Sequence, residues 1–194
     1  FGNKTMTTGE GGMVATNDDA LADKARRLKN QGQSPERSYW HDLVGFNYRM
    51  TNMQAAIGLA QLENLDTFVA LKRENAERYR NYLQHPQIQH SAEMPGTIHS
   101  YWMYSILLND FAGTHRDEFV DILRGKGVET RNFFYPIHTL PIYRDRANYD
   151  FPIAEDIASR GINLPSSTRL NEEDVAYVCN LVGDTLEELG RKYG

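Results

Sequence analysis

The sequence has little of what several classes of protein require. Cys179 is the one cysteine among 194 residues, so no disulfide can form within the chain and a reducing cytoplasm is the expected compartment. No apolar run approaches the ~20 residues that a membrane-spanning helix needs. Acidic residues outnumber basic ones by 26 to 21, which leaves no basic surface for nucleic-acid phosphates. We therefore expect neither a membrane nor a nucleic acid as a partner.

The motifs of two large groups of enzymes are also missing. The six histidines are scattered, and none stands near the cysteine or another histidine at the spacing of metal ligands. The chain has no His-Glu-x-x-His and no Gly-x-Ser-x-Gly segment, which argues against zinc peptidase and serine hydrolase chemistry. We therefore expect no metal site. The composition, 40% apolar and 24% charged, provides enough apolar material for one substantial core or two modest ones.

The first third of the chain predicts short strands and two helices with clear start signals. Residues 5–8 and 13–16 are expected to form strands around Gly9-Glu10-Gly11-Gly12, because glycine permits a sharp bend. Asn17 or Asp18 caps a helix that ends near Asn30, and residues 33–45 form a loop. Thr51-Asn52-Met53-Gln54 fits a capping box, with small apolar residues following at helical spacing. Another long helix is expected at residues 64–84.

After a connection at residues 85–98, strands and helices alternate. We expect strands at residues 100–108, 128–134 and 162–164, helices at residues 114–124 and 152–160, and an aromatic- and proline-rich loop at residues 135–151. A final helix begins after Asn171, and an apolar stripe recurs along it at helical spacing: Val175, Val178, Val182, Leu186 and Leu189. The alternation predicts an α/β or α+β domain.

Lys4, which precedes the glycine-rich segment, is the first residue that could carry chemistry. A lone lysine is usually a solvated surface residue, and the glycines here do not have the spacing of a phosphate-binding loop. A lysine that captures an aldehyde needs a partly dry site, because burial lowers the pKa of an amine and leaves it uncharged. The sequence around Lys4 does not show whether such a site exists.

Two further segments combine polar and aromatic side chains. Asn47 and Arg49 directly precede the helix expected after Thr51, whose unpaired N–H groups could help to hold a phosphate; they could instead be a turn residue and a surface charge. Tyr135 and His138 stand among prolines in the aromatic loop, where His138 could donate to a sugar or phosphate oxygen. The alternative is a core-lining loop with a hydrogen-bonded histidine.

In this order and spacing, the segments resemble the DegT/DnrJ/StrS family of sugar aminotransferases. FGNKTMTTGEGG resembles the family's lysine segment, GFNYRMTNMQAAIGLAQLE its Asn-Tyr-Arg segment, and INLPSSTRLNEEDVAYV its C-terminal signature. The resemblance implies the aspartate-aminotransferase-like fold of type I pyridoxal-phosphate enzymes. Residues 1–66 would then be the C-terminal part of the large cofactor-binding domain. Residues 67–194 would be the small C-terminal α/β domain, including the interdomain helix.

The same resemblance implies a role for each candidate residue. Lys4 would bind pyridoxal 5'-phosphate through a Schiff base and then move protons during transamination. Asn47 would reach the cofactor phosphate of the other subunit of a homodimer, while Arg49, Tyr135 and His138 would lie near the substrate. The reaction implied is amino transfer, with glutamate as the usual donor in the family, to a 4-keto-6-deoxy nucleotide sugar. A related dehydratase branch has histidine where the lysine stands, so Lys4 indicates transamination.

Members of this family are about twice as long as this chain. The half that would precede residue 1 should hold an Asp for the pyridine nitrogen, an aromatic ring to stack on the cofactor, and a helix N-terminus for its phosphate. We therefore expect the isolated 194-residue chain to be inactive. One alternative is a non-catalytic dimerisation or interaction fragment. Another is a regulatory protein that acts on transcription, for which the charge pattern offers no basic face.

Overall fold

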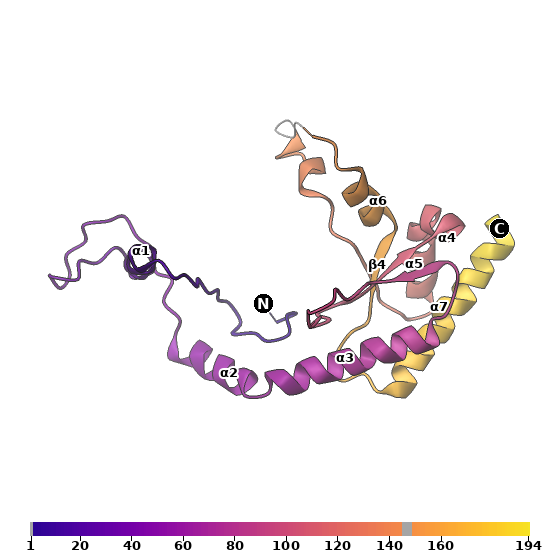
Figure 1. Ribbon diagram of the computed structural model, residues 1–194, viewed down its shortest axis with the longest axis horizontal. Coiled ribbons are helices and arrows are strands. Elements are labelled where there is room, and N and C mark those ends of the chain that lie inside the picture. Colours follow the sequence, from indigo (N-terminus) through magenta and orange to yellow (C-terminus); the bar gives the residue numbers. More distant parts are fainter. Residues whose placement is uncertain (1, 145–148) are drawn as a thin grey trace. The chain divides into compact units, whose positions relative to one another are not determined.

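The computed structural model describes residues 2–144 and 149–194 and divides the chain into two compact units, Phe1–Asp66 and Thr67–Gly194 (Figure 1). The boundary falls inside a helix, α3 (Leu65–Tyr82), so the backbone continues from one unit to the other without a loop at that position. That the first unit is the tail of a large cofactor-binding domain, and the second a small C-terminal domain, stays a prediction.

The first unit contains two helices, α1 (Asp19–Lys29) and α2 (Asn52–Leu62). The carboxylate of Asp18 caps α1 by accepting a hydrogen bond from the backbone N–H of Leu21 at 3.0 Å. Thr51 begins α2 with the capping box that the sequence predicts, because the hydroxyl of Thr51 and the side chain of Gln54 each accept a backbone N–H of the other residue. The first residue of α1 and of α2 is therefore determined by hydrogen bonds between residues within one helical turn.

The strands expected at residues 5–8 and 13–16 are not formed, and that prediction is wrong. A strand needs a partner that accepts and donates along its edge, and the turn between these segments does not bring them together as a hairpin. Instead the backbone of Thr7 is bonded on both sides by the side chain of Gln61, which lies on α2. An irregular segment, in which a glutamine side chain satisfies the backbone of Thr7, takes the place of the expected strand at residues 5–8.

The second unit is built on a four-stranded sheet of order β1-β2-β4-β3, in which all neighbours are antiparallel. The strands are β1 (Ile88–His90), β2 (Tyr104–Leu108), β3 (Arg131–Asn132) and β4 (Gly161–Leu164). All four residues of β4 are buried, whereas β2 alternates buried and half-buried side chains. Helices and strands alternate along the chain, so the mixed α/β class predicted from the sequence is confirmed.

Several boundaries differ from the prediction. The first strand, β1, lies in the segment expected to be a mere connection, and Ile88 pairs opposite Leu108 of β2. The strand expected at residues 100–108 begins only at Tyr104, and Tyr101, within the expected range, adopts a left-handed φ of 44° that is unfavourable in a regular strand. The helix expected at residues 114–124 forms as α5 (Arg116–Gly125), and a short helix that was not predicted, α4 (Asp110–Thr114), precedes it. The strand expected at residues 128–134 shrinks to two residues.

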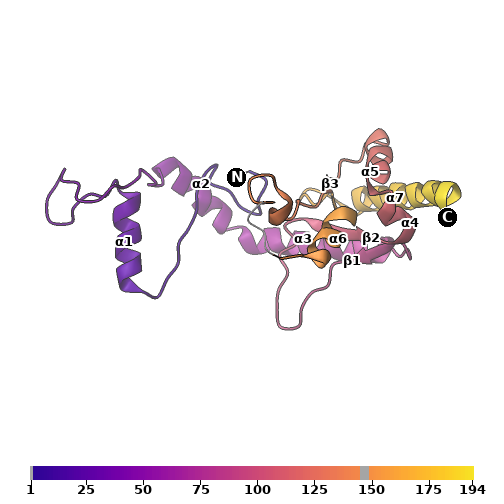
Figure 2. The same ribbon diagram turned by 90° about the horizontal axis from the view of Figure 1, so that it is seen from above.

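In the described part of the second unit, four α-helices and one single-turn helix accompany this sheet in addition to α3. They are α4 (Asp110–Thr114), α5 (Arg116–Gly125), the single-turn η1 (Ile137–Thr139), α6 (Pro152–Arg160) and α7 (Glu172–Tyr193). The last helix, α7, packs against α4 and α5 (Figure 2). Asn171 caps it, and the whole predicted stripe is buried: Val175, Val178, Val182, Leu186 and Leu189. No helix in the described part of the chain is long and apolar enough to cross a membrane.

The core of the second unit contains aromatic rings and one thiol. The rings of Tyr79 and Tyr104 stack with centroids 4.5 Å apart, and the hydroxyl of Tyr79 donates to the carbonyl of Pro165 at 2.8 Å. Burial raises the pKa of both phenols above the ordinary value. Cys179 is buried nearby, and burial raises the pKa of its thiol to about 12. A thiol that is buried and protonated fills space in a core and is a poor nucleophile.

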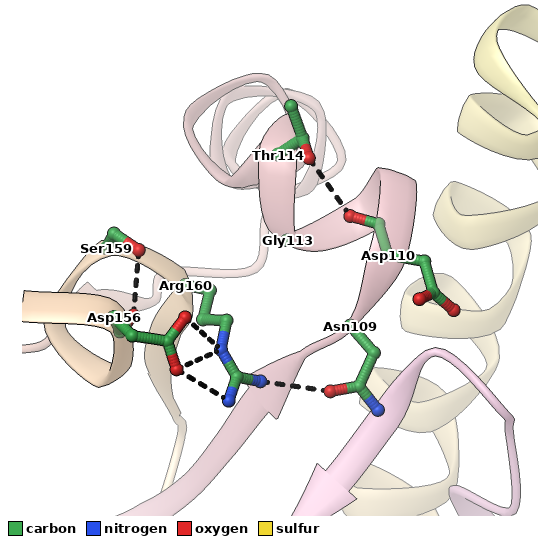
Figure 3. Close-up of a pocket in the computed structure, with 7 residues that line it drawn as sticks. All are labelled: Asn109, Asp110, Gly113, Thr114, Asp156, Ser159 and Arg160. Carbon is green, nitrogen blue, oxygen red and sulfur yellow. Dashed lines mark hydrogen bonds and ion pairs between the residues drawn. The ribbon is translucent and has the colours of Figure 1, made fainter. Parts of the chain in front are cut away.

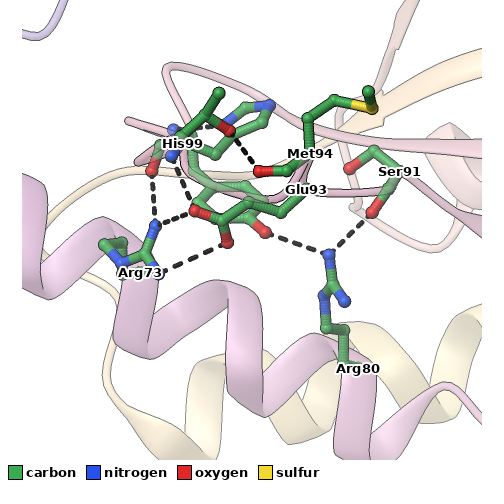
Figure 4. Close-up of polar contacts among 8 residues, drawn as sticks. Arg73, Arg80, Ser91, Glu93, Met94 and His99 are labelled. Atoms are coloured by element: carbon green, nitrogen blue, oxygen red, sulfur yellow. Dashed lines mark hydrogen bonds and ion pairs between the residues drawn. The ribbon is translucent and has the colours of Figure 1, made fainter.

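Two arginines of α3 fix the long connection between β1 and β2 (Figure 4). Arg73 donates to both carboxylate oxygens of Glu93, at 2.8 and 3.3 Å, and to the carbonyl of His99 at 2.9 Å. Arg80, two turns further along α3, donates to the carbonyl of Ser91 and to the hydroxyl of Tyr101. The two arginines therefore hold this connection against α3, although it has no regular secondary structure.

Candidate functional site

The structure brings the lysine segment against α2, the helix that follows the Asn-Tyr-Arg segment. The side-chain amide of Gln61 donates to the carbonyl of Thr7 at 2.6 Å, and its oxygen accepts the N–H of Thr7 at 3.0 Å. Gln54 donates to the carbonyl of Glu10 at 3.3 Å. A Cβ added to Gly58, which is buried, would lie 2.8 Å from the γ-methyl of Thr8. Glycine at this position is therefore what allows α2 to approach the segment so closely.

Lys4 lies three residues before the anchored Thr7 and is exposed. The described residues thus place an exposed primary amine close in sequence to a backbone position that α2 holds. They do not supply the dry surroundings that a Schiff-base lysine needs. The role of Lys4 stays a prediction.

Asn47 lies in a segment that docks on the C-terminal end of α1. The N–H of Phe46 donates to the carbonyl of Leu28 at 2.7 Å, and the N–H of Tyr48 donates to the carbonyl of Lys29 at 3.0 Å. These bonds satisfy carbonyls that the end of a helix leaves without partners. Asn47 itself is exposed, so its backbone is held in place while its amide faces outward.

Gly32 and Gly45 permit this docking. Gly32 has a left-handed φ of 67°, and a Cβ there would lie 2.0 Å from the carbonyl oxygen of Leu43. A Cβ on Gly45 would lie 2.2 Å from the backbone nitrogen of Gly32. A side chain at either glycine would collide with the backbone of the facing segment, so glycine at both positions permits the close approach that the Asn-Tyr-Arg segment makes.

Arg49 is exposed and stands between the docked segment and the start of α2. From the sequence we expected that the unpaired N–H groups at this helix end could help to hold a phosphate. In the structure the capping box already uses the N–H groups of Thr51 and Gln54. The capping box does not use the N–H groups of Asn52 and Met53, and the binding of a phosphate by this helix end with Asn47 and Arg49 stays a prediction.

His138 and Tyr135 belong to the second unit and have different surroundings. Tyr135 is exposed, whereas the side chain of His138 is 17% exposed. The Nε2 of His138 lies 2.7 Å from a carboxylate oxygen of Glu155 on α6, and its ring lies against Phe151 with centroids 4.7 Å apart. The histidine thus has a hydrogen-bond partner, as the alternative reading expected, but the loop does not line the core, because Phe134, Tyr135 and Ile137 are exposed.

Sequence reasoning missed Glu155. Its position in the first turn of α6, after a proline at the first helical position, is a common place for an acidic residue and gives no sign of a histidine partner. The two partners lie 17 positions apart in the sequence, so no local pattern encodes their pairing.

A separate pocket in the second unit, of about 500 Å³, contains none of the predicted site residues (Figure 3). Its lining residues are Asn109, Asp110, Gly113, Thr114, Asp156, Ser159 and Arg160. Arg160 donates to the carboxylate of Asp156 at 3.0 Å and to the side chain of Asn109 at 3.0 Å. Several polar groups of the lining, those of Asn109, Asp156 and Arg160, bond to one another. Among the described residues no group of three or more His, Cys, Asp or Glu side chains could hold a metal ion.

Comparison with known proteins gives one consistent family. A model described as the DegT/DnrJ/EryC1/StrS aminotransferase family matches residues 1–183. A GDP-perosamine synthase of Vibrio cholerae is 49% identical over 94% of this chain and 50% of its own length, and one of Escherichia coli O157:H7 is 48% identical over 95% and 50%. A protein of Bacillus subtilis named as a putative pyridoxal phosphate-dependent aminotransferase, EpsN, is 33% identical over 93% of this chain and 47% of its own length.

Solved structures give the same picture. The aminotransferase PseC of Helicobacter pylori, described as involved in the biosynthesis of pseudoaminic acid, matches with a TM-score of 0.88 and 26% identity, covering 95% of this chain and 51% of that one. The aminotransferase TlmJ of Streptoalloteichus hindustanus matches with a TM-score of 0.85 and 30% identity, covering 94% and 49%. These matches confirm the predicted fold class. The chain spans about half the length of the curated relatives it matches.

Proposed function

The chain belongs to the DegT/DnrJ/EryC1/StrS aminotransferase family, and from that premise we propose that it is the catalytic-lysine half of a pyridoxal-phosphate-dependent nucleotide-sugar aminotransferase. The substrate we propose is GDP-4-keto-6-deoxymannose with glutamate as the amino donor, as in a GDP-perosamine synthase. The similarity to two proteins of that name, at 48% and 49% identity, supports this choice of sugar and nucleotide.

The observation that carries the proposal is the anchoring of the lysine segment on α2. The two hydrogen bonds between Gln61 and Thr7 fix the backbone three residues from Lys4, so the amine starts from a defined place. Bound pyridoxal phosphate supplies an aldehyde that takes up amino groups and a conjugated ring that withdraws electrons from the neighbouring carbon. Lys4 would hold this cofactor through its amine, and the same amine would move a proton at the α-carbon of the donor.

The residues present fit part of what this cofactor requires. Lys4 offers an exposed primary amine for the aldehyde, and Asn47 offers an exposed amide donor on a backbone held by α1. We propose that Asn47 binds the cofactor phosphate of the other subunit in a homodimer. Arg49, Tyr135 and His138 would bind the nucleotide sugar. The carboxylate for the ring nitrogen and the dry walls around Lys4 would come from residues that precede this chain in the complete protein.

Borohydride reduction followed by peptide mapping tests the proposal. In the complete, cofactor-loaded protein, reduction should fix the cofactor on the peptide that contains Lys4. The variant Lys4→Ala should lose the label, whereas Lys72→Ala should keep it, since Lys72 is half-buried in the other unit and donates to backbone carbonyls. No label on Lys4 would favour the second candidate, a non-catalytic dimerisation fragment. Label on another lysine would refute the assignment of the site.

A further inference from the structure

The imidazole of His138 is held on one edge and one face by α6. Its Nε2 lies 2.7 Å from Glu155, and Phe151 at the helix cap covers the ring. The N–H of Glu155 donates to the carbonyl of Phe151 at 3.1 Å, so both contacts come from a single helical turn. The backbone of His138 is fixed as well, because the turn η1 is closed by hydrogen bonds from Thr139 to Pro136 and from Leu140 to Ile137. Because these contacts fix the imidazole of His138, its other nitrogen, Nδ1, points in one defined direction.

The partner at Nε2 determines what that remaining nitrogen can do. An ionised carboxylate can only accept, so the hydrogen of the pair lies on Nε2. In a neutral ring Nδ1 then carries a lone pair and no hydrogen. Such a nitrogen accepts a hydrogen bond from a hydroxyl group, but it repels a phosphate oxygen, which can also only accept.

We propose that Glu155 is a positioning residue that makes His138 a hydroxyl acceptor, which directs it to the sugar ring of the nucleotide sugar and away from the diphosphate. The inference rests on the proposed function, because the hydroxyl belongs to the substrate named there. The sequence left open whether His138 contacts a sugar oxygen or a phosphate oxygen, and this proposal selects the sugar. It also assigns a role to Glu155, whose neighbour Asp156 bonds to Arg160 instead.

Three variants of the complete, cofactor-loaded protein separate positioning from structure. Glu155→Ala removes the acceptor at Nε2, and we expect KM for the keto-sugar to rise about tenfold with little change in kcat. Glu155→Gln keeps a side-chain oxygen that accepts the Nε2 hydrogen, and it should restore KM to within about twofold of wild type. Asp156→Ala is the matched control, since it removes a carboxylate from the same helix without touching His138. The half-reaction with the amino donor should be unchanged in all three.

Binding of two probes identifies the group that His138 meets. GDP-mannose carries sugar hydroxyls, whereas GDP has only the nucleotide and phosphates. Glu155→Ala should weaken binding of GDP-mannose about tenfold and leave GDP unchanged. Equal weakening of both probes, or of neither, would overturn the inference. A wild-type protein that transaminates but whose Glu155→Ala variant has an unaltered KM would overturn it too, while the proposed function would stand.

The hydrogen on the ring can be observed without any ligand. Nitrogen-15 NMR of His138 in the complete protein should show Nε2 protonated and Nδ1 unprotonated, and Glu155→Ala should mix the two tautomers. A ring protonated on both nitrogens, or on Nδ1 alone, would refute the inference. If the wild-type protein bound neither GDP-mannose nor GDP, the proposed substrate would be wrong, and the NMR measurement would still decide the role of Glu155.

Discussion

Gln61 is the residue whose removal tests the anchoring of the lysine segment most directly. It donates to the carbonyl of Thr7 at 2.6 Å and accepts the N–H of Thr7 at 3.0 Å. A hydrogen bond of this kind contributes about 1 kcal/mol net, so losing both should cost about 2 kcal/mol of local stability. Because about 1.4 kcal/mol corresponds to a factor of ten, the opening of this segment should become roughly 30-fold more frequent.

Two substitutions give a graded series. Gln61→Ala removes both bonds, while Gln61→Glu keeps an oxygen that accepts the N–H of Thr7 and loses the donor to its carbonyl. We expect hydrogen exchange of the Thr7 amide in the complete protein to be roughly 30-fold faster in Gln61→Ala and only severalfold faster in Gln61→Glu. Gln89→Ala, at an exposed position of β1, is the control for loss of a glutamine side chain.

The functional consequence is a weaker hold on the cofactor. A looser lysine segment has more freedom to lose when Lys4 attaches, so the cofactor should dissociate faster in the same order of variants. If the Thr7 amide exchanged at the same rate in Gln61→Ala and in the Gln89→Ala control, the hydrogen bonds of Gln61 would not hold the lysine segment. The observation that carries the proposed function would then be refuted.

Four further outcomes are expected. Lys4→Ala in the complete protein should abolish turnover while circular dichroism stays that of wild type; measurable activity would exclude Lys4 as the catalytic amine. Asn47→Ala should weaken cofactor retention, and mixed dimers of Lys4→Ala and Asn47→Ala subunits should regain one working site, whereas mixed dimers as inactive as the unmixed ones would contradict the cross-subunit role. The isolated 194-residue chain should show no absorbance band of bound cofactor at about 420 nm, and such a band would refute our expectation that the preceding half is needed. The pKa of Glu93 lies below its ordinary value, first because Arg73 donates a hydrogen bond to its carboxylate, so the stability that Glu93 contributes should be complete above the ordinary glutamate pKa and lost on acidification. The difference in denaturation midpoint between wild type and Glu93→Gln should therefore shrink between about pH 7 and about pH 3. A difference that stayed constant over this range would argue against a stabilising ion pair.

Features that depend on neighbours within one helical turn could be predicted from the sequence. Asp18, Thr51 and Asn171 cap the helices that follow them, as expected, because each cap bonds to an N–H three residues away. The apolar stripe of α7 is buried as its spacing predicts. The resemblance of the lysine and Asn-Tyr-Arg segments to one family, which the comparisons confirm, was likewise contained in the sequence.

Features that depend on distant residues were decided by the tertiary structure. A strand exists only if a partner lies beside it, which is why β1 formed without a recognisable pattern while the strands expected at residues 5–8 and 13–16 did not. Gln61 bonds to Thr7, which lies 54 positions away in the sequence, and Glu155 bonds to His138, which lies 17 positions away. Neither pairing leaves a local signal, because the chain path between the partners sets it. The sequence therefore determined which residues are candidates for chemistry, and the fold determined what holds Lys4's segment in place and which edge of His138 is free to meet a ligand.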